Sequence, residues 1–494
     1  MNFKTKQVDY LSLGLSIIAA GYILLYLFTV SLRLFYPYEL EWMEGALLTN
    51  SLHIYQGKAL YSAPSAEFIP YLYTPLYTYV VALVMNFTGV NFLAGRLVSI
   101  LSSLLCTWLL YRIIKRETNN SQTALISAGF FLASYRFTGT WMDIVRVDTF
   151  QLFLLVLGFY LLRYYLATVW GVYAAAGVFS LAFFSKQSAP IFIIAAGSAI
   201  FFSHRKKSLI FLLSCCLFSG VGIWMANYFS HGWFLFYTYK ILKAYKFKPK
   251  YFFEIFLPDL KFNLPFILAL ITGWYLYEII NKFKNGLPFF WTRAFFAGFL
   301  SSIMMRSKDG GYTNSFLTLC YFAPLLTGLI WDKAQRCKAY WRYLIAGLVL
   351  CQFGLFAYKP FHQAPNAQDK TAGEILLKRI AAFPGPVLVA SHPYYSIMAG
   401  KEMTMHDMAL YDAMLISDLP PDLADNIRSR RYSAIILDQV KTDNGQLGMP
   451  DFLPLDLVKK GYYRAETIFP LEDDRFYPVA GYQVRPQFIY LPKE

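Results

Sequence analysis

The sequence predicts a mainly α-helical membrane protein: a bundle of about eleven spanning helices followed by a small C-terminal α/β domain. Of the 494 residues, 57% are hydrophobic and only 15% are charged, and the mean hydropathy is +0.40. Apolar runs of about 18–20 residues, the length that a helix needs to cross a bilayer, recur through the first three quarters of the chain. A soluble domain rarely has this composition, so we expect a multi-pass protein.

Basic segments between the apolar runs predict the orientation of the bundle. Lysine and arginine accumulate in cytoplasmic loops, so we place the basic segments 112–116, 204–207, 282–284 and 333–342 in the cytoplasm, together with the N-terminus. The first apolar run is too long for a signal-peptide core and is interpreted as a retained span. The chain then ends outside. The predicted spans are 10–32, 95–112, 122–136, 149–166, 169–185, 188–203, 208–229, 263–281, 287–305, 314–331 and 342–358.

The apolar segment 73–87 does not fit this series of spans. It is only about 15 residues long and contains Pro75 near its start. A span here would move every later basic loop to the outside. We therefore expect a helix that lies along the outer membrane interface.

The composition becomes polar after about residue 360. Residues 373–382 and 422–430 have helical patterns, whereas 386–391 and 433–438 are typical of buried strands. We therefore divide the chain into a transmembrane domain, 1–359, and an outer α/β domain, 360–494.

Acidic and basic side chains gather in the loops that this topology places outside. The stretch YELEWMEG, residues 38–45, contains three carboxylates beside a membrane, where acids usually have a function. We interpret Glu39 as a solvated loop acid. The candidates for chemistry or binding are Glu41, Glu44, Tyr73, Arg96, Asp143, Arg146, Asp148, Lys186, Arg306 and Lys308.

These two kinds of group suit glycosyl transfer from a sugar carried on a lipid phosphate. A carboxylate takes the proton of the attacking hydroxyl, and cations stabilise the departing phosphate. Arginine can bind phosphate with two parallel hydrogen bonds, and Gly310-Gly311 beside Lys308 lets backbone amides approach a phosphate. The chain has neither GxxxxGK[ST] nor GxGxxG, in keeping with a donor that is not a nucleotide.

The order EWMEG, IYQGKALY, YTPLY and GVNFLAGRLVS resembles the N-terminal region of the GT-C class of membrane glycosyltransferases, which includes protein O-mannosyltransferases and aminoarabinose transferases. VRVDTFQLFLL, SKQSA and KDGGYTN resemble later landmarks of a bacterial branch that has a C-terminal outer domain. The resemblance implies a polyprenyl-phosphate sugar donor and an acidic residue in the first outer loop as the base. Direct transfer from such a donor would invert the anomeric centre. Glu44 occupies the second acidic position of the motif and is favoured over Glu41.

Simpler interpretations accompany these roles. Glu41 and Glu44 could form interfacial ion pairs with Arg33 or Arg96, and Asp143, Arg146 and Asp148 could pair with one another at a helix start. Lys186 could extend from a span end toward the interface.

The expected partners are the lipid donor, the bilayer and a glycan, lipid or protein acceptor, without nucleic acid. The expected location is a bacterial inner membrane. No metal-ligand spacing is present, although the first-loop acids and Asp143 could hold a divalent cation through their oxygens.

Two other functions are compatible with the sequence: a transporter of lipid-linked sugars, and an inactive scaffold with a partner-binding outer domain. The absence of inverted repeats and the scarcity of charges within the spans count against a transporter.

Overall fold

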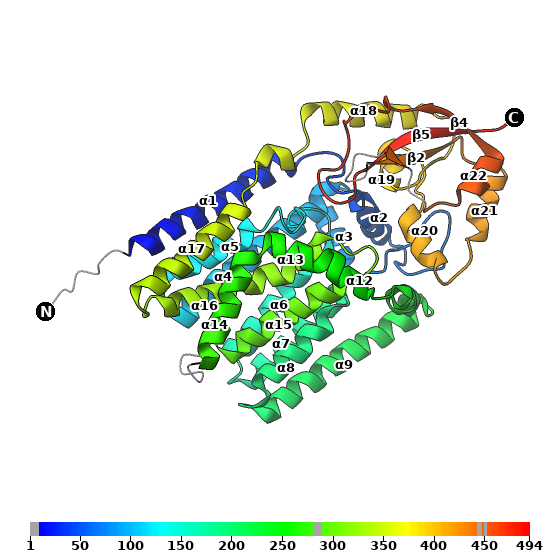
Figure 1. Cartoon of the computed structure of the whole chain (residues 1–494). Helices are drawn as coiled ribbons and strands as arrows, with labels where there is room; N and C mark the ends of the chain where they lie inside the picture. Colours follow the sequence, from blue (N-terminus) through cyan, green and yellow to red (C-terminus); the bar gives the residue numbers. More distant parts are fainter. Residues whose placement is uncertain (1–8, 281–287, 442–446, 449–451) are drawn as a thin grey trace.

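The computed structural model describes residues 9–280, 288–441, 447–448 and 452–494, and it confirms a helical bundle with a small sheet near the C-terminus (Figure 1). The basic residues Lys282 and Lys284 lie outside the described residues. The bundle helices are α1 (Tyr10–Arg33), α4 (Phe92–Thr118), α5 (Ser121–Ala133), α6 (Val147–Tyr164), α7 (Val169–Ser185), α8 (Ala189–Phe201), α9 (Arg205–Phe229), α14 (Pro265–Ile280), α15 (Phe289–Arg306), α16 (Leu317–Ala334) and α17 (Ala339–Leu355).

Each predicted span coincides with one of these helices, but not all of them are long and apolar enough to cross a membrane. Five helices meet both conditions, or up to seven if each of two bent pairs is one span. The difference from the predicted number, about eleven, arises because helices such as α5 and α8 have only 13 residues each. The polar Asn119 and Asn120 interrupt the apolar pattern before α5, and the Asn120 side chain caps that helix by accepting hydrogen bonds from two backbone N–H groups.

Two helices, α2 (Glu44–Tyr55) and α3 (Leu76–Thr88), lie in the loop between α1 and α4, which is the first loop predicted to be outside. The position of α3 matches the segment predicted to lie along the interface. Its 13 residues give a length of about 20 Å, which is too short to cross a bilayer.

The long segment between α9 and α14 is helical rather than an irregular loop. It consists of α10 (Trp233–Leu235), the π-helical turn η1 (Phe236–Ile241), α11 (Leu242–Ala244), α12 (Pro249–Tyr251), a second π-helical turn η2 (Phe252–Phe256) and α13 (Leu257–Asn263). The chain bends by 87° at the junction of α13 with α14. This bend separates the surface helices from the bundle.

The C-terminal residues form a mixed sheet with helices around it. The elements are α18 (Ala367–Ala381), β1 (Val387–Val389), α19 (Pro393–Met398), α20 (Asp407–Met414), α21 (Pro421–Arg428), β2 (Ala434–Lys441), β3 (Leu447–Gly448), α22 (Leu455–Gly461), β4 (Tyr462–Thr467) and β5 (Val484–Pro492). The strand order is β1-β2-β5-β4, with β3 paired to β2. β1 and β2 are parallel, whereas β5 is antiparallel to both of its neighbours. β1 and β2 agree with the predicted strands, and β3, β4 and β5 were not predicted.

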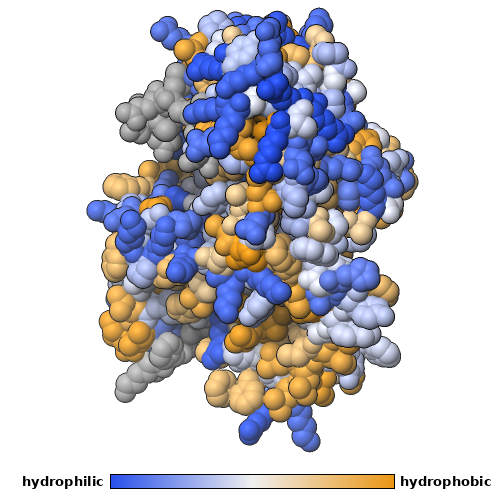
Figure 2. All heavy atoms as spheres, turned by 90° about the vertical axis from the view of Figure 1, so that its right-hand side faces the viewer, coloured by the Kyte–Doolittle hydropathy of each residue, from blue (hydrophilic) through white to orange (hydrophobic). Residues whose placement is uncertain are grey.

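The stretch YELEWMEG lies between the bundle and this sheet. Tyr38 packs against Gly373 so closely that a Cβ on the glycine would lie 2.2 Å from the Tyr38 ring. Trp42 forms a small core with Val440 and Val484 of the sheet. Figure 2 shows hydrophilic residues gathered at the C-terminal end of the molecule and apolar residues over the helices. The acidic stretch therefore lies inside the molecule, between the helical bundle and the C-terminal sheet.

Candidate active site

Glu44, favoured as the base, forms a fully buried ion pair with Arg96. Each carboxylate oxygen accepts two hydrogen bonds: Oε1 from Arg96 Nε at 3.2 Å and the Val145 N–H at 2.8 Å, Oε2 from Arg96 Nη2 at 2.9 Å and the Leu40 N–H at 2.6 Å. Neither side chain is exposed. These four donors occupy both oxygens, so the Glu44 carboxylate has little room for a substrate hydroxyl.

Arg96 also holds the backbone of the first outer loop. Its guanidinium donates to the carbonyl groups of Arg33 at 3.3 Å, Tyr36 at 2.5 Å and Tyr38 at 2.6 Å. The predicted substrate-binding residue is thus fully engaged within the protein. Together, Glu44 and Arg96 fix the loop that carries the other acids.

Glu41 differs from Glu44 in having an oxygen without a partner. Its side chain is buried, and Oε1 has no hydrogen-bond partner among the described residues. Oε2 lies 3.6 Å from Arg146 Nη1 and accepts a hydrogen bond from the Met43 N–H at 3.3 Å. Burial raises the pKa of the Glu41 carboxyl to about 7, although Arg146 opposes the shift. A carboxyl that titrates near neutral pH is well suited to general base catalysis.

Arg146 lies next to Glu41 and contacts two aromatic rings. Its guanidinium carbon is 4.8 Å from the Trp141 ring centre and 6.0 Å from that of Tyr73. The side chain is buried, and Nε has no hydrogen-bond partner among the described residues. An unpaired N–H on a buried guanidinium can donate to an anionic ligand.

Asp148 connects Arg146 to the next cation along the site. Its Oδ1 accepts from Lys186 Nζ at 2.6 Å and from the Asn314 amide at 3.0 Å, while Oδ2 accepts from Trp141 Nε1 at 3.1 Å. Three loops that are predicted to lie on the same side of the membrane therefore meet at one carboxylate. We interpret Asp148 as the residue that positions Lys186.

Lys308 extends the row of cations toward the C-terminal domain. Burial and the nearby Lys186 lower the pKa of its ammonium group to about 8. The Lys308 ammonium lies 5.9 Å from the ring centre of Tyr245, whose hydroxyl donates to Asp412 of α20. Burial raises the pKa of Asp412 to about 7. Asp412 could not be predicted from the sequence, because no pattern distinguishes it from other acids of the polar tail.

Arg306 has internal partners, in contrast to Lys308. Its Nε donates to Asp259 at 2.7 Å, and its Nη1 donates to the Gly311 carbonyl. The backbone of Gly310 is in the left-handed region, with φ of 70°, where glycine is favoured. The predicted phosphate contact of Arg306 requires it to leave these partners.

Asp143, predicted to bind substrate, is paired with an arginine. Its Oδ2 lies 2.8 Å from Arg33 Nε, its Oδ1 accepts a hydrogen bond from the Tyr135 hydroxyl at 3.0 Å, and both charged side chains are buried. Arg33 also donates to the carbonyl of Thr140 at 3.2 Å. Asp143 therefore fixes the second outer loop against the end of α1.

The interpretation of Glu39 as a solvated acid is wrong. Glu39 is buried and forms a short contact with His392 Nδ1, and the other ring nitrogen of His392 lies 3.3 Å from Asp438 of β2. Burial alone lowers the pKa of His392, but the two carboxylates raise it to about 10. A buried imidazolium thus ties the first outer loop to the C-terminal sheet.

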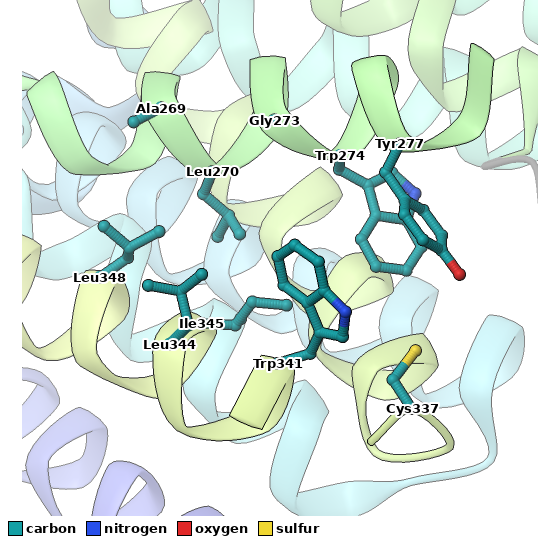
Figure 3. Close-up of a pocket in the computed structure, with 10 residues that line it drawn as sticks. All are labelled: Ala269, Leu270, Gly273, Trp274, Tyr277, Cys337, Trp341, Leu344, Ile345 and Leu348. Atoms are coloured by element: carbon teal, nitrogen blue, oxygen red, sulfur yellow. The ribbon is translucent and has the colours of Figure 1, made fainter. Parts of the chain in front are cut away.

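A separate apolar pocket lies between α14 and α17 (Figure 3). Its volume is about 150 Å³, and Trp274, Tyr277 and Trp341 surround it together with Leu270, Leu344 and Leu348. None of its lining residues is charged. It therefore lacks the groups that glycosyl transfer requires.

The acids of the first loop and Asp143 are the residues predicted to be able to hold a divalent cation. Within the described ranges, no group of three or more His, Cys, Asp or Glu residues is arranged to hold a metal ion. Glu44 and Asp143 are each occupied by an arginine, so their oxygens do not fit a shared cation with Glu41.

Comparisons with known proteins agree with the predicted resemblance. Residues 72–224 match the family model of dolichyl-phosphate-mannose-protein mannosyltransferase. The structure is similar to that of ArnT from Cupriavidus metallidurans in the apo state, with a TM-score of 0.59, 10% identity, and coverage of 96% of this chain and 97% of that chain. It is also similar to ArnT from the same organism bound to undecaprenyl phosphate, with a TM-score of 0.60, 10% identity and the same coverages.

No curated protein matches the sequence. The fold extends over nearly the entire length of both chains. The predicted resemblance is thereby confirmed: this multi-pass membrane protein has the fold of the GT-C membrane glycosyltransferases and, over residues 72–224, the sequence pattern of one of their families.

Proposed function

We propose that this protein transfers a sugar from a polyprenyl-phosphate donor to an acceptor hydroxyl at the outer face of the membrane. The observation that carries the proposal is the juxtaposition of Glu41, which has an unpaired oxygen, with Arg146, which has an unpaired N–H. A base and a phosphate-binding cation are thus side by side. The fold similarity to an ArnT bound to undecaprenyl phosphate supports the same type of donor.

In the proposed reaction, Glu41 rather than Glu44 takes the proton of the acceptor hydroxyl. The hydroxyl oxygen forms a bond to the anomeric carbon of the sugar, and the bond from that carbon to the phosphate oxygen breaks. The electron pair leaves with the polyprenyl phosphate. Direct displacement inverts the anomeric centre.

The leaving phosphate is bound by Arg146, Lys186 and Lys308 in this proposal. Negative charge accumulates on the phosphate as the bond breaks, so these cations stabilise the transition state more than the bound donor. Tyr73 packs over Arg146 and keeps its guanidinium in place. Asp148 holds Lys186, and Arg306 contributes only if it exchanges its bond to Asp259.

The proposal is tested with the full-length protein in detergent, where no transport across a membrane can occur. We expect the wild type to release undecaprenyl phosphate from undecaprenyl-phosphate sugars in the presence of an envelope fraction as the source of acceptor. Lys308→Ala should reduce kcat at least about tenfold, because it removes a cation that acts on the leaving group. Lys459→Ala, which alters a lysine of α22 in the C-terminal domain, is the control.

Failure of the wild type to release undecaprenyl phosphate with any sugar tried would contradict the proposed glycosyl transfer. Movement of the lipid-linked sugar across reconstituted vesicles, dependent on Lys308, would then identify a transporter instead.

We further propose that the N-terminus is cytoplasmic and that residues 360–494 form an outer domain. The basic residues in the last turn of α4, Lys115 and Arg116, and at the start of α9, Arg205 to Lys207, support this orientation. Alkaline phosphatase fused after Glu494 should be active, whereas the same enzyme fused after Lys207 should be inactive. The reverse pattern would invert the topology and move the candidate site to the cytoplasmic face.

A further inference from the structure

A polar cavity lies on the side of Glu41 that faces the C-terminal domain. Its volume is about 450 Å³, which is within the range of small-molecule sites. It is formed jointly by the second outer loop, the loop after α15, the start of the C-terminal region and the sheet. The lining residues are Arg136, Gly139, Thr140, Tyr312, Gln363, Lys441, Val479, Ala480, Gly481 and Gln483.

Gly481, which lines this cavity, also lies against the Glu41 side chain with its unpaired oxygen. A Cβ added to Gly481 would lie 2.8 Å from Glu41 Oε1 and 2.7 Å from Glu41 Cγ. The adjacent Ala480 N–H donates to the Leu40 carbonyl at 2.9 Å, so this turn of the C-terminal domain is fixed against the first outer loop. Gly481 therefore lies between the cavity and the Glu41 carboxylate.

The opposite wall is held in place by buried groups. Arg33 donates to the Gln363 carbonyl at 2.7 Å and to the Thr140 carbonyl at 3.2 Å, and it is paired with Asp143. The Tyr312 ring lies 5.1 Å from that of Trp141, which in turn contacts Arg146. The cavity is therefore a preformed site rather than a gap between mobile loops.

The charges around the cavity favour an anion. Arg136 is exposed and forms no ion pair with any described residue. Lys441 is paired at 2.7 Å with Asp474, but that carboxylate is 78% exposed and easily displaced by a ligand. None of the lining residues is acidic, while Thr140, Gln363 and Gln483 supply hydroxyl and amide groups that suit a sugar.

We propose that this cavity binds the acceptor, and that the acceptor carries an anionic group, phosphate or carboxylate, on a sugar. Arg136 and Lys441 bind the anionic group, and the acceptor hydroxyl reaches Glu41 past Gly481. The C-terminal domain then has a defined role, because it supplies one half of the acceptor site. The inference rests on the proposed glycosyl transfer and adds the class of acceptor to it.

The first experiment measures binding to the full-length protein in detergent, with the phosphate site filled by undecaprenyl phosphate. Glucose 6-phosphate, glucuronate and glucose are titrated by calorimetry. We expect at least one of the two anionic sugars to bind at least tenfold more tightly than glucose. Arg136→Ala and Lys441→Ala should each weaken that binding about tenfold, whereas Arg428→Ala, at an exposed arginine of α21, should leave it unchanged.

Equal binding of all three sugars, or binding that neither variant weakens, would overturn the anionic acceptor site. Since this experiment involves no transfer, its failure leaves the reaction itself standing. The distinction between a phosphate and a carboxylate comes from which of the two anionic sugars binds more tightly.

The second experiment tests whether the acceptor reaches Glu41 from the cavity, past Gly481. Gly481→Ala places a methyl group against the carboxylate and should reduce transfer to the envelope fraction at least tenfold, while undecaprenyl phosphate still binds. Gly400→Ala is the matched control, because both glycines lie in the C-terminal region with φ of 74° and nothing lies within 4 Å of a Cβ at Gly400. Equal activity of the two variants would contradict access to Glu41 from this side.

Discussion

Replacement of Glu41 by glutamine should lower turnover by about 10²–10⁴-fold, the usual contribution of a general base. Glutamine preserves the shape of the side chain and removes its ability to accept a proton. The protein should still bind undecaprenyl phosphate, because Lys186 and Lys308 remain. The measurement is the initial rate of undecaprenyl phosphate release by the purified variant, together with its affinity for undecaprenyl phosphate.

The control for this variant is Glu67→Gln, which alters another glutamate of the first outer loop. Glu67 is 55% exposed and pairs with Lys58. We expect that variant to retain wild-type turnover. Near-normal turnover of Glu41→Gln would remove the central residue of the proposed mechanism.

Replacement of Glu44 by glutamine should instead destabilise the protein. The change leaves Arg96 without its counter-ion in a fully buried position. Removing one partner of a buried ion pair costs about 3–5 kcal/mol, because the remaining charge is uncompensated. The free energy of unfolding in mixed micelles measures this effect, and the exposed pair of Glu67 with Lys58 should contribute no more than about 1 kcal/mol.

A different outcome for Glu44→Gln would change the assignment. If the variant were as stable as the wild type and yet inactive, Glu44 would be the base, as the sequence resemblance favoured. Loss of stability with turnover retained in the folded fraction agrees with a structural role.

The helices could be predicted from the sequence because their signals are local. Apolar runs locate the eleven bundle helices, and Pro75 locates the start of α3. The number of helices long enough to span was overestimated, since hydropathy alone does not give the positions of caps such as Asn120. The strand β5 was missed because Arg485 and Gln487 interrupt its apolar pattern, although both side chains are buried.

The roles of the acids could not be predicted because their partners are remote in the sequence. Glu44 and Arg96 are 52 residues apart, and Glu39 and His392 are 353 residues apart. Three carboxylates within six residues therefore have three environments: Glu44 is paired with Arg96, Glu39 with His392, and Glu41 with Arg146 at the longer distance of 3.6 Å. They are distinguished by residues of α4, of the loop before α6 and of the C-terminal region, which only the folded chain brings together.

The dependence of kcat/KM on pH tests the central claim, that Glu41 is the base, most directly. Glu41 acts when deprotonated, so kcat/KM for the donor should rise with pH through the Glu41 pKa of about 7. Lys308 binds phosphate when protonated, so kcat/KM should fall as pH passes the Lys308 pKa of about 8. In Glu41→Gln, the residual activity should lack the rising limb. A rising limb that persists in this variant, or a wild-type profile that is flat between about pH 6 and 7.5, would contradict Glu41 as the base.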